Sequence, residues 1–129
     1  MKKWLLFVLV TSALMFGEAK AQDGMLGEVR LFAGNFEPRG WAFCDGQELN
    51  ISDYSALYSI IGTYYGGDGR NTFALPNWQG AVPVGAGKSN ANNTFDVGEN
   101  VGIGGQNNGV KGLGMHYIIC TSGTFPSRN

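Results

Sequence analysis

The first half of the chain alternates apolar and polar residues over short stretches. Residues 27–33 alternate charged and aliphatic side chains, which is the two-residue period of a half-buried strand. A second short strand is expected over 41–44, and Asp45-Gly46 is a strong two-residue hairpin signal that leads into 47–49. The pattern therefore predicts a small antiparallel meander.

A glycine-hinged segment in the middle of the chain is expected to organise the core. Residues 66–69 read Gly-Gly-Asp-Gly, a tight reversal, and 72–75 form a short apolar strand that Pro76 ends or confines to a sheet edge. Residues 115–120 form a further buried strand near the end of the chain. We expect Phe73 and Leu75 to be clamped between this closing strand and the strand that begins at Trp41.

A short helix is predicted after the meander. Ser52 and Asp53 can cap its start, and Gly62 is placed to end it. Its apolar positions follow the helical i, i+3, i+4, i+7 spacing: Tyr54, Leu57, Tyr58 and Ile61. A helix of about two to three turns is too short to be stable alone, so it must pack on the sheet with Leu57, Ile60 and Ile61 in the core.

The first residues have the layout of a secretory signal peptide. Lys2 and Lys3 precede an apolar run over 4–16, and Ala19-Lys20-Ala21 is a small-residue cleavage site. The run is shorter than the roughly 20 residues that a membrane span needs, although an uncleaved anchor is the alternative. We expect a signal peptide over 1–21, a domain over 22–129, and no membrane span after cleavage.

Length and composition favour one small β-rich domain. The chain has 129 residues and 21 glycines without a collagen period, which indicates many turns. We predict an α+β, mainly β fold of short antiparallel hairpins, one short helix and glycine-rich turns. Basic residues are scattered and the net charge is −1, so a nucleic-acid partner is not expected. Residues 88–114 are rich in Ser, Asn and Gly, with a hairpin-type turn at Asn108-Gly109.

Four ordered motifs resemble phage tail-collar domain proteins, which include the exported bacterial microcystin-dependent proteins. They are GEVRLFAGNFEPRGWAFCDGQELNIS at 27–52, the helix-like stretch around 56–62, GGDGRNTFALPNWQGAVPVG at 66–85, and YIICTSGTFPSRN at 117–129. The third is similar to the family pattern GGDGxxTFxLPDLRGRVPVG. The residues that carry the resemblance are expected to be structural: Gly40, Trp41, Cys44, Asp45, Gly46, Gly66, Gly67, Asp68, Gly69, Thr72, Phe73, Leu75, Pro76, Gly80, Pro83 and Pro126.

The chain departs from the family at two places. Residues 77–81 read NWQGA where the family has DLRGR, which implies a different or lost partner surface. Many members also carry a long His-rich insertion in the region of 88–114, and this sequence has none; only 95–102 resembles the family's LGE-x-GG element.

Two stretches resemble nucleotide- or calcium-binding motifs, but each lacks residues that the motif requires. Residues 85–89 read GAGKS, but a P-loop needs a glycine where Val82 stands and a helix where an Asn-rich stretch follows. The Gly-Gly-Asp-Gly turn lacks the ligand spacing of a calcium loop, so Asp68 is expected to cap its own reversal. No cofactor is expected.

The residues available for catalysis are few. His116 is the only histidine, and it lies about 13 Å along a strand from Cys120, so a Cys-His pair is not expected. It is interpreted as a packed side chain, with a metal shared by three copies on a three-fold axis as the alternative. No spacing selects a carboxylate pair for sugar hydrolysis among Asp45, Glu48, Asp68 and Asp96.

Cys44 and Cys120 are the only cysteines, and both lie at the ends of predicted strands. In an exported chain they are a candidate disulfide, and closing a loop of about 76 residues would contribute up to ~4 kcal/mol. Two buried thiols are the alternative.

Tyr64 and Trp78 are the candidate ligand surface. Aromatic residues in a small β domain are more often core, but beside Asn71 and Asn77 an exposed ring could stack on a carbohydrate.

The resemblance implies a non-enzymatic structural module that is exported to the periplasm, cell surface or medium. In tail fibres such domains are linked with trimeric, receptor-contacting tips, so we expect a homo-oligomer, as a trimer or polymer, with a cell-surface glycan or protein receptor as candidate partner. The alternatives are a monomeric secreted carbohydrate-binding module and, less favoured by the residues, a secreted hydrolase.

Overall fold

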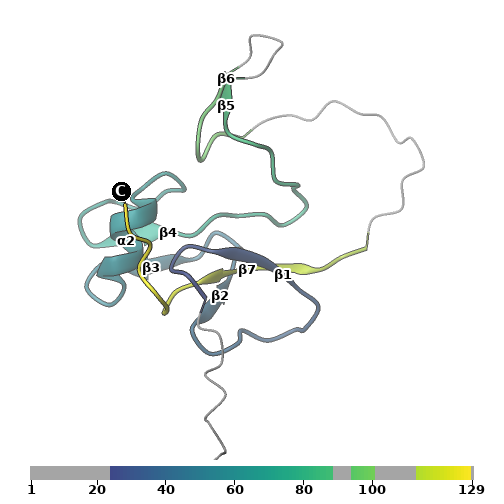
Figure 1. Ribbon diagram of the computed structural model, residues 1–129, viewed down its shortest axis with the longest axis horizontal. Coiled ribbons are helices and arrows are strands. Elements are labelled where there is room, and N and C mark those ends of the chain that lie inside the picture. Colours follow the sequence, from purple (N-terminus) through teal and green to yellow (C-terminus); the bar gives the residue numbers. More distant parts are fainter. Residues whose placement is uncertain (1–23, 89–93, 101–112, 129) are drawn as a thin grey trace, which may run out of the picture.

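The computed structural model describes residues 24–88, 94–100 and 113–128 (Figure 1). The elements in chain order are β1 (Val29–Phe32), β2 (Trp41–Phe43), β3 (Glu48–Asn50), α2 (Ser55–Ile61), β4 (Thr72–Ala74), β5 (Gly87–Lys88), β6 (Thr94–Phe95) and β7 (His116–Cys120). The described residues form a mainly β fold with short antiparallel sheets and one short helix, as the pattern predicts. The predicted signal peptide over 1–21 and the Asn108-Gly109 turn lie outside the described residues.

The largest sheet is built around the last strand. Its order is β1-β7-β2, with Val29 opposite Ile119 in one ladder and Ala42 opposite Ile119 in the other. Ile118 and Ile119 point to opposite faces of β7, and both are buried. A strand that is buried on both faces has little water to bond its backbone N–H and C=O groups, so these groups need a partner strand on each edge. β7 therefore occupies the centre of the sheet.

The predicted meander is wrong. β2 pairs with β7, whereas β3 pairs with β4, with Leu49 opposite Phe73. Asp45-Gly46 does form a tight turn, because Asp45 Oδ1 accepts the Gln47 backbone N–H at 3.1 Å and Gly46 has φ +84°. The turn passes the chain to a second sheet instead of folding it back on β2, because β3 forms its ladder with β4.

The segment around Asp68 holds the turn that starts β4. Asp68 Oδ1 accepts the backbone N–H groups of residues 70, 71 and 72 at 2.8, 2.7 and 2.8 Å, which confirms that Asp68 caps its own reversal. Gly67 has φ +91°, and a Cβ there would collide with the backbone of Phe73. The turn therefore requires both the carboxylate and the glycine.

The helix begins later than its sequence pattern suggests. Its N-cap residue is Tyr54, which makes no side-chain cap hydrogen bond, so capping by Ser52 or Asp53 is wrong. Asp53 instead accepts hydrogen bonds from the Asn50 and Ser52 side chains. Gly62 ends the helix as predicted, with φ +49° and its N–H bonded to the Tyr58 carbonyl.

One core joins the helix and the two sheets. Phe73 and Leu75 have no solvent exposure, which confirms that they lie in the core. The predicted clamp between β2 and β7 is wrong, because these two strands pair directly with each other. They lie in one cluster with Leu57 and Ile61 of α2, while Ile60 is half-buried against it. The cluster also contains Leu26, Ala42, Cys44 and Ile119. Near the ends of the described chain, Met25 bridges Thr124 in a parallel pair, and the Leu26 N–H donates to the Thr124 carbonyl at 2.9 Å.

The candidate disulfide between Cys44 and Cys120 is not formed; both are buried thiols. Cys120 lies opposite Trp41, and the Cys44 N–H donates to the Tyr117 carbonyl, so the two cysteines are three ladder positions apart. That offset is about 10 Å along the strands, beyond the roughly 7 Å Cα separation that a disulfide tolerates. Burial raises the pKa of the Cys44 thiol to about 12.

The Asp68 turn predicts a pH-dependent stability difference. Hydrogen bonds from the backbone of Thr72, Asn71 and Arg70 lower the pKa of Asp68 from 3.8 to about 2. Because the folded-state pKa is lowered, the stabilisation is complete above about pH 4 and is lost as the pH falls through about 2. Asp68→Asn should lower the urea midpoint at pH 7, and the gap to the unmodified protein should close towards pH 2.

Asp53→Asn is the control for this series, because Asp53 accepts hydrogen bonds only from neighbouring side chains. A gap for Asp68→Asn that stays constant between pH 7 and pH 2 would contradict the role of the ionised carboxylate.

The strand register predicts the redox state of the cysteines. Unfolding without reductant, followed by alkylation, should add two alkyl groups to the chain, as measured by intact mass. In the folded protein Cys44 should react slowly, because its thiolate is scarce and the sulfur is buried. An unchanged mass after alkylation of the unfolded, unreduced protein would show that the register is wrong.

Candidate functional site

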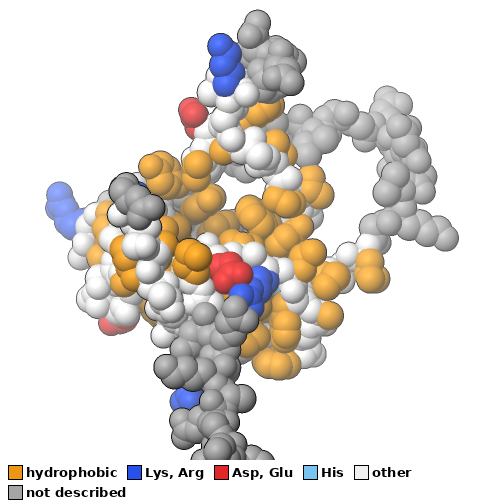
Figure 2. All heavy atoms as spheres, viewed as in Figure 1, with side chains coloured by type: hydrophobic (Ala, Val, Ile, Leu, Met, Phe, Trp, Pro, Cys, Tyr) orange, Lys and Arg blue, Asp and Glu red, His pale blue; other side chains and the backbone are white. Residues whose placement is uncertain are grey.

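A hollow opens between the body of the domain and a projecting arm. The arm consists of residues 81–88 and 94–100, and it carries the β5–β6 hairpin away from the body (Figure 1). The hollow, which we call the groove, has a volume of about 370 Å³. Figure 2 shows hydrophobic side chains gathered around this opening. Its lining includes Tyr64, Tyr65, Asn77 and Trp78 from the body, and Val82, Val84, Phe95, Asp96, Val97, Gly98, Glu99 and Asn100 from the arm.

Trp78 is held in the groove by contacts on its other sides. The backbone N–H of Trp78 donates to the Cys44 carbonyl at 2.9 Å, and Asn77 forms an antiparallel bridge with Asp45. The indole ring packs edge-on against Tyr117, with 4.7 Å between ring centroids. Trp78 is thus half-buried and fixed to the sheet, with part of its surface left to the groove.

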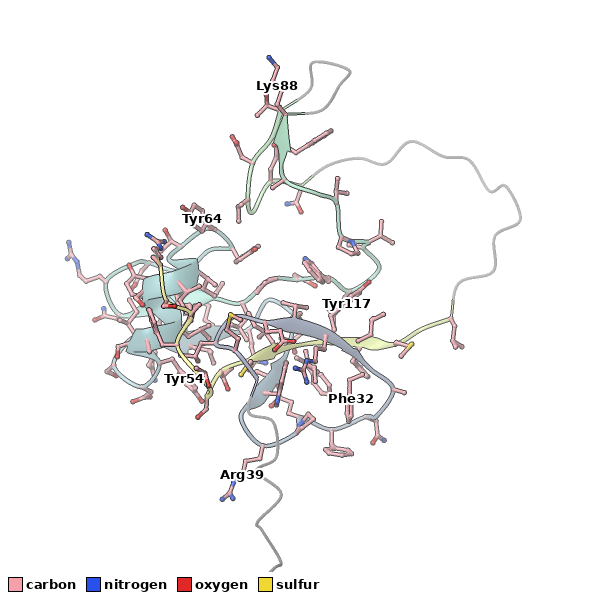
Figure 3. All side chains as sticks on the ribbon, viewed as in Figure 1. Phe32, Arg39, Tyr54, Tyr64, Lys88 and Tyr117 are labelled. Carbon is pink, nitrogen blue, oxygen red and sulfur yellow. The ribbon has the colours of Figure 1, made fainter. Side chains whose placement is uncertain are left out.

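Tyr64 reaches the groove from the turn that follows α2. The Tyr64 N–H donates to the Ile61 carbonyl at 3.3 Å, and the side chain is 62% exposed. Figure 3 places Tyr64 on the side of the body that faces the arm, with Lys88 at the outer end of the arm. Next to it, burial raises the pKa of Tyr65, so this hydroxyl stays protonated and can donate a hydrogen bond.

The arm touches the body at Gly98. This residue has φ +86°, and a Cβ there would collide with the carbonyl of Tyr64. Only glycine allows such an approach at a positive φ. Gly98 also lines the groove, so this close approach sets the distance between Tyr64 and the arm there.

The charges in the groove are acidic. Asp96 and Glu99 are its only ionisable residues besides the two tyrosines, and no Lys, Arg or His is among the residues that line it. Glu99 Oε2 accepts the Asp96 backbone N–H at 3.0 Å, which fixes the turn at the base of the hairpin. The groove therefore offers hydrogen-bond acceptors beside aromatic and aliphatic surface.

Tyr64 and Trp78, the two predicted ligand residues, both line the groove, so the structure brings them to one place. Their binding role stays a prediction. Asn71, which we expected beside them, instead lies in the Asp68 turn, where its Nδ2 donates to Asp68 Oδ2 at 3.4 Å. Asp96 and Glu99 were not predicted as groove residues, although the resemblance of 95–102 to a family element was a signal for this segment.

The remaining motif residues have mainly backbone roles where the structure describes them. Glycines with positive φ stand at the turns that the motifs mark: Gly40, Gly46, Gly66, Gly67, Gly69 and Gly80. Pro76 is buried at the end of β4, whereas Pro83 is exposed on the arm. Pro126 is half-buried in the final described segment.

His116 is exposed and stacks on Phe43 with 4.4 Å between ring centroids. Within 24–88, 94–100 and 113–128, no three His, Cys, Asp or Glu side chains are placed to hold a metal ion. A metal shared by three copies stays a hypothesis about an assembly. Of the four carboxylates considered for hydrolysis, Asp96 lines the groove, whereas Asp45 and Asp68 bond to turns and Glu48 lies in β3.

The segment that resembles a phosphate loop has a different structure. Lys88 lies in β5, opposite Thr94 of β6. Among the described helical residues, no stretch has both the length and the apolar character needed to cross a bilayer.

Comparison with known proteins agrees with the motifs. No curated protein matches the chain. The family model for the phage tail collar domain matches residues 27–83, from the start of β1 through β4 and onto the arm. Residues 27–83 of this chain are therefore similar to the phage tail collar domain.

Proposed function

We propose that this protein is an exported, non-enzymatic structural module that self-associates outside the cytoplasm and contacts a receptor. The observation that carries the proposal is the match of residues 27–83 to a structural domain of phage tails. Collar domains in tail fibres are typically trimeric, which supports an oligomer here. Export is supported by the basic start, the short apolar run and the Ala19-Lys20-Ala21 site.

The arm supports self-association. Every residue from 81 to 86 is exposed, including Val82 at 62% and Val84 at 45%. The whole stretch from Asn71 to Gly87 lacks a charged residue. Exposed segments of monomers usually carry charges that prevent association, so an uncharged, valine-bearing arm favours a protein partner.

A structural role is also supported by how the family motif uses its polar groups. The carboxylate of Asp68 is occupied by three backbone N–H groups, and Asp45 bonds to the turn after β2. These side chains hold turns in place and are not presented to a substrate. We place the receptor contact at the groove, where the polar groups face an opening.

A monomeric carbohydrate-binding module is the second candidate function. The observation that favours it is the convergence of Tyr64 and Trp78 on the groove. Unlike the first proposal, this function does not require the protein to self-associate.

Export and self-association can be tested on one sample. The full chain is expressed in a secreting bacterial host, and the exported product is examined by intact mass and by size exclusion with light scattering. We expect a chain that begins at Gln22 and a trimer or larger assembly. A monomer at all concentrations would contradict self-association, and a product that retains residues 1–21 would contradict cleavage.

Charge on the arm should weaken the assembly. Val82→Asp with Val84→Asp should shift the protein towards monomer, because burial of the two carboxylates in an interface is costly. The control is Phe36→Asp, since Phe36 is also 62% exposed but lies outside the arm. Equal oligomer size in all three proteins would exclude the arm from the interface.

A further inference from the structure

We propose that the groove is a binding site for an uncharged oligosaccharide, with Tyr64 and Trp78 as stacking surfaces and Asp96 and Glu99 as hydrogen-bond acceptors. This inference rests on the proposed exposure of the protein outside the cytoplasm, and it names the chemical class of the receptor.

The aromatic residues match the apolar faces of a sugar. Pyranose rings present C–H groups on their faces, and these pack against aromatic rings in the same way as other apolar groups. Tyr64 comes from the turn after α2, and Trp78 comes from the segment after β4, so the groove has an aromatic side chain from each of two segments. Its volume of about 370 Å³ lies within the roughly 300–1,000 Å³ of small-molecule sites.

The polar groups match the edges of a sugar. Hydroxyl groups are donors, and carboxylates are strong acceptors for them. The side chain of Asp96 accepts no hydrogen bond within the described part of the chain, and Glu99 uses Oε2 for the Asp96 N–H. Among the described residues, three carboxylate oxygens of the groove, both of Asp96 and Oε1 of Glu99, have no hydrogen-bond donor and are the acceptors that we assign to a ligand.

The charge of the groove selects against acidic sugars. Two carboxylates line it and no basic residue does, so an anionic ligand would meet like charge without a counter-ion. Hydroxyl groups meet no such penalty. Neutral saccharides are therefore the class that both the aromatic and the acidic residues accept.

The site is largely formed before a ligand arrives. Trp78 is fixed by Tyr117 and by its backbone bond to Cys44, and Gly98 holds the arm against Tyr64. Since these groups are already ordered, little conformational entropy is lost when a ligand binds.

The test is calorimetric titration of the exported protein with neutral and acidic hexasaccharides. The neutral probes are maltohexaose, cellohexaose and chitohexaose, and the acidic probe is hexagalacturonate. We expect at least one neutral probe to bind with Kd on the order of 1 mM or tighter, and hexagalacturonate to bind at least about tenfold more weakly. Tyr64→Ala should raise Kd for the neutral probe roughly tenfold, as expected for the loss of one stacking contact.

Two variants make the result specific to the groove. Phe36→Ala removes a ring of the same exposure from outside the groove and should leave Kd unchanged. Asp96→Lys should weaken neutral binding and strengthen hexagalacturonate binding, because it places a cation in the groove. Circular dichroism of each variant confirms that it is folded.

The inference is overturned if none of the neutral probes binds, if Tyr64→Ala and Asp96→Lys bind them unchanged, or if hexagalacturonate binds the unmodified protein equally well. Light scattering on the same samples separates this result from the proposed self-association. An assembly that binds no sugar would support the proposed structural role and contradict the sugar site. A monomer that binds sugar would support the sugar site and contradict self-association.

Discussion

The central position of β7 is the constraint on which the rest of the structure depends. Ile119 packs in the core cluster with Phe73 and Leu75, and its strand supplies the hydrogen bonds for both β1 and β2. Without β7, those two strands would have no partner, and the inner face of β2 would lose its neighbours. The helix and the β3–β4 pair then cover the same core from the other side.

The positions of several strands and the end of the helix could be predicted from residues close by in the sequence. The strands around Val29, Trp41 and Phe73 follow from alternation or apolar runs, and the end of the helix follows from Gly62. The pairing of the strands was not predictable in the same way. The Asp45-Gly46 turn has the chemistry of a hairpin, but the partner of β2 is set by burial of β7, which lies far along the chain.

The candidate site was predictable only in its aromatic part. Tyr64 and Trp78 were visible as aromatic residues near turns, but their common location depends on where the arm runs. Asp96 and Glu99 sit in a Gly- and Asn-rich stretch with little periodicity, so no pattern placed them beside those rings. The contact at Gly98 decides that placement, and it depends on a positive φ that several glycines in the chain could equally have adopted.

The position of β7 also affects when the protein can fold. Val29 pairs with Ile119, so the first strand of the largest sheet waits for a strand that is synthesised about 90 residues later (119 − 29 = 90). Contacts of such high sequence separation form slowly, because a long loop must close before they contribute. The largest sheet therefore cannot close until β7 has left the ribosome. Until then, β1 and β2 have unpaired edges that other chains can pair with.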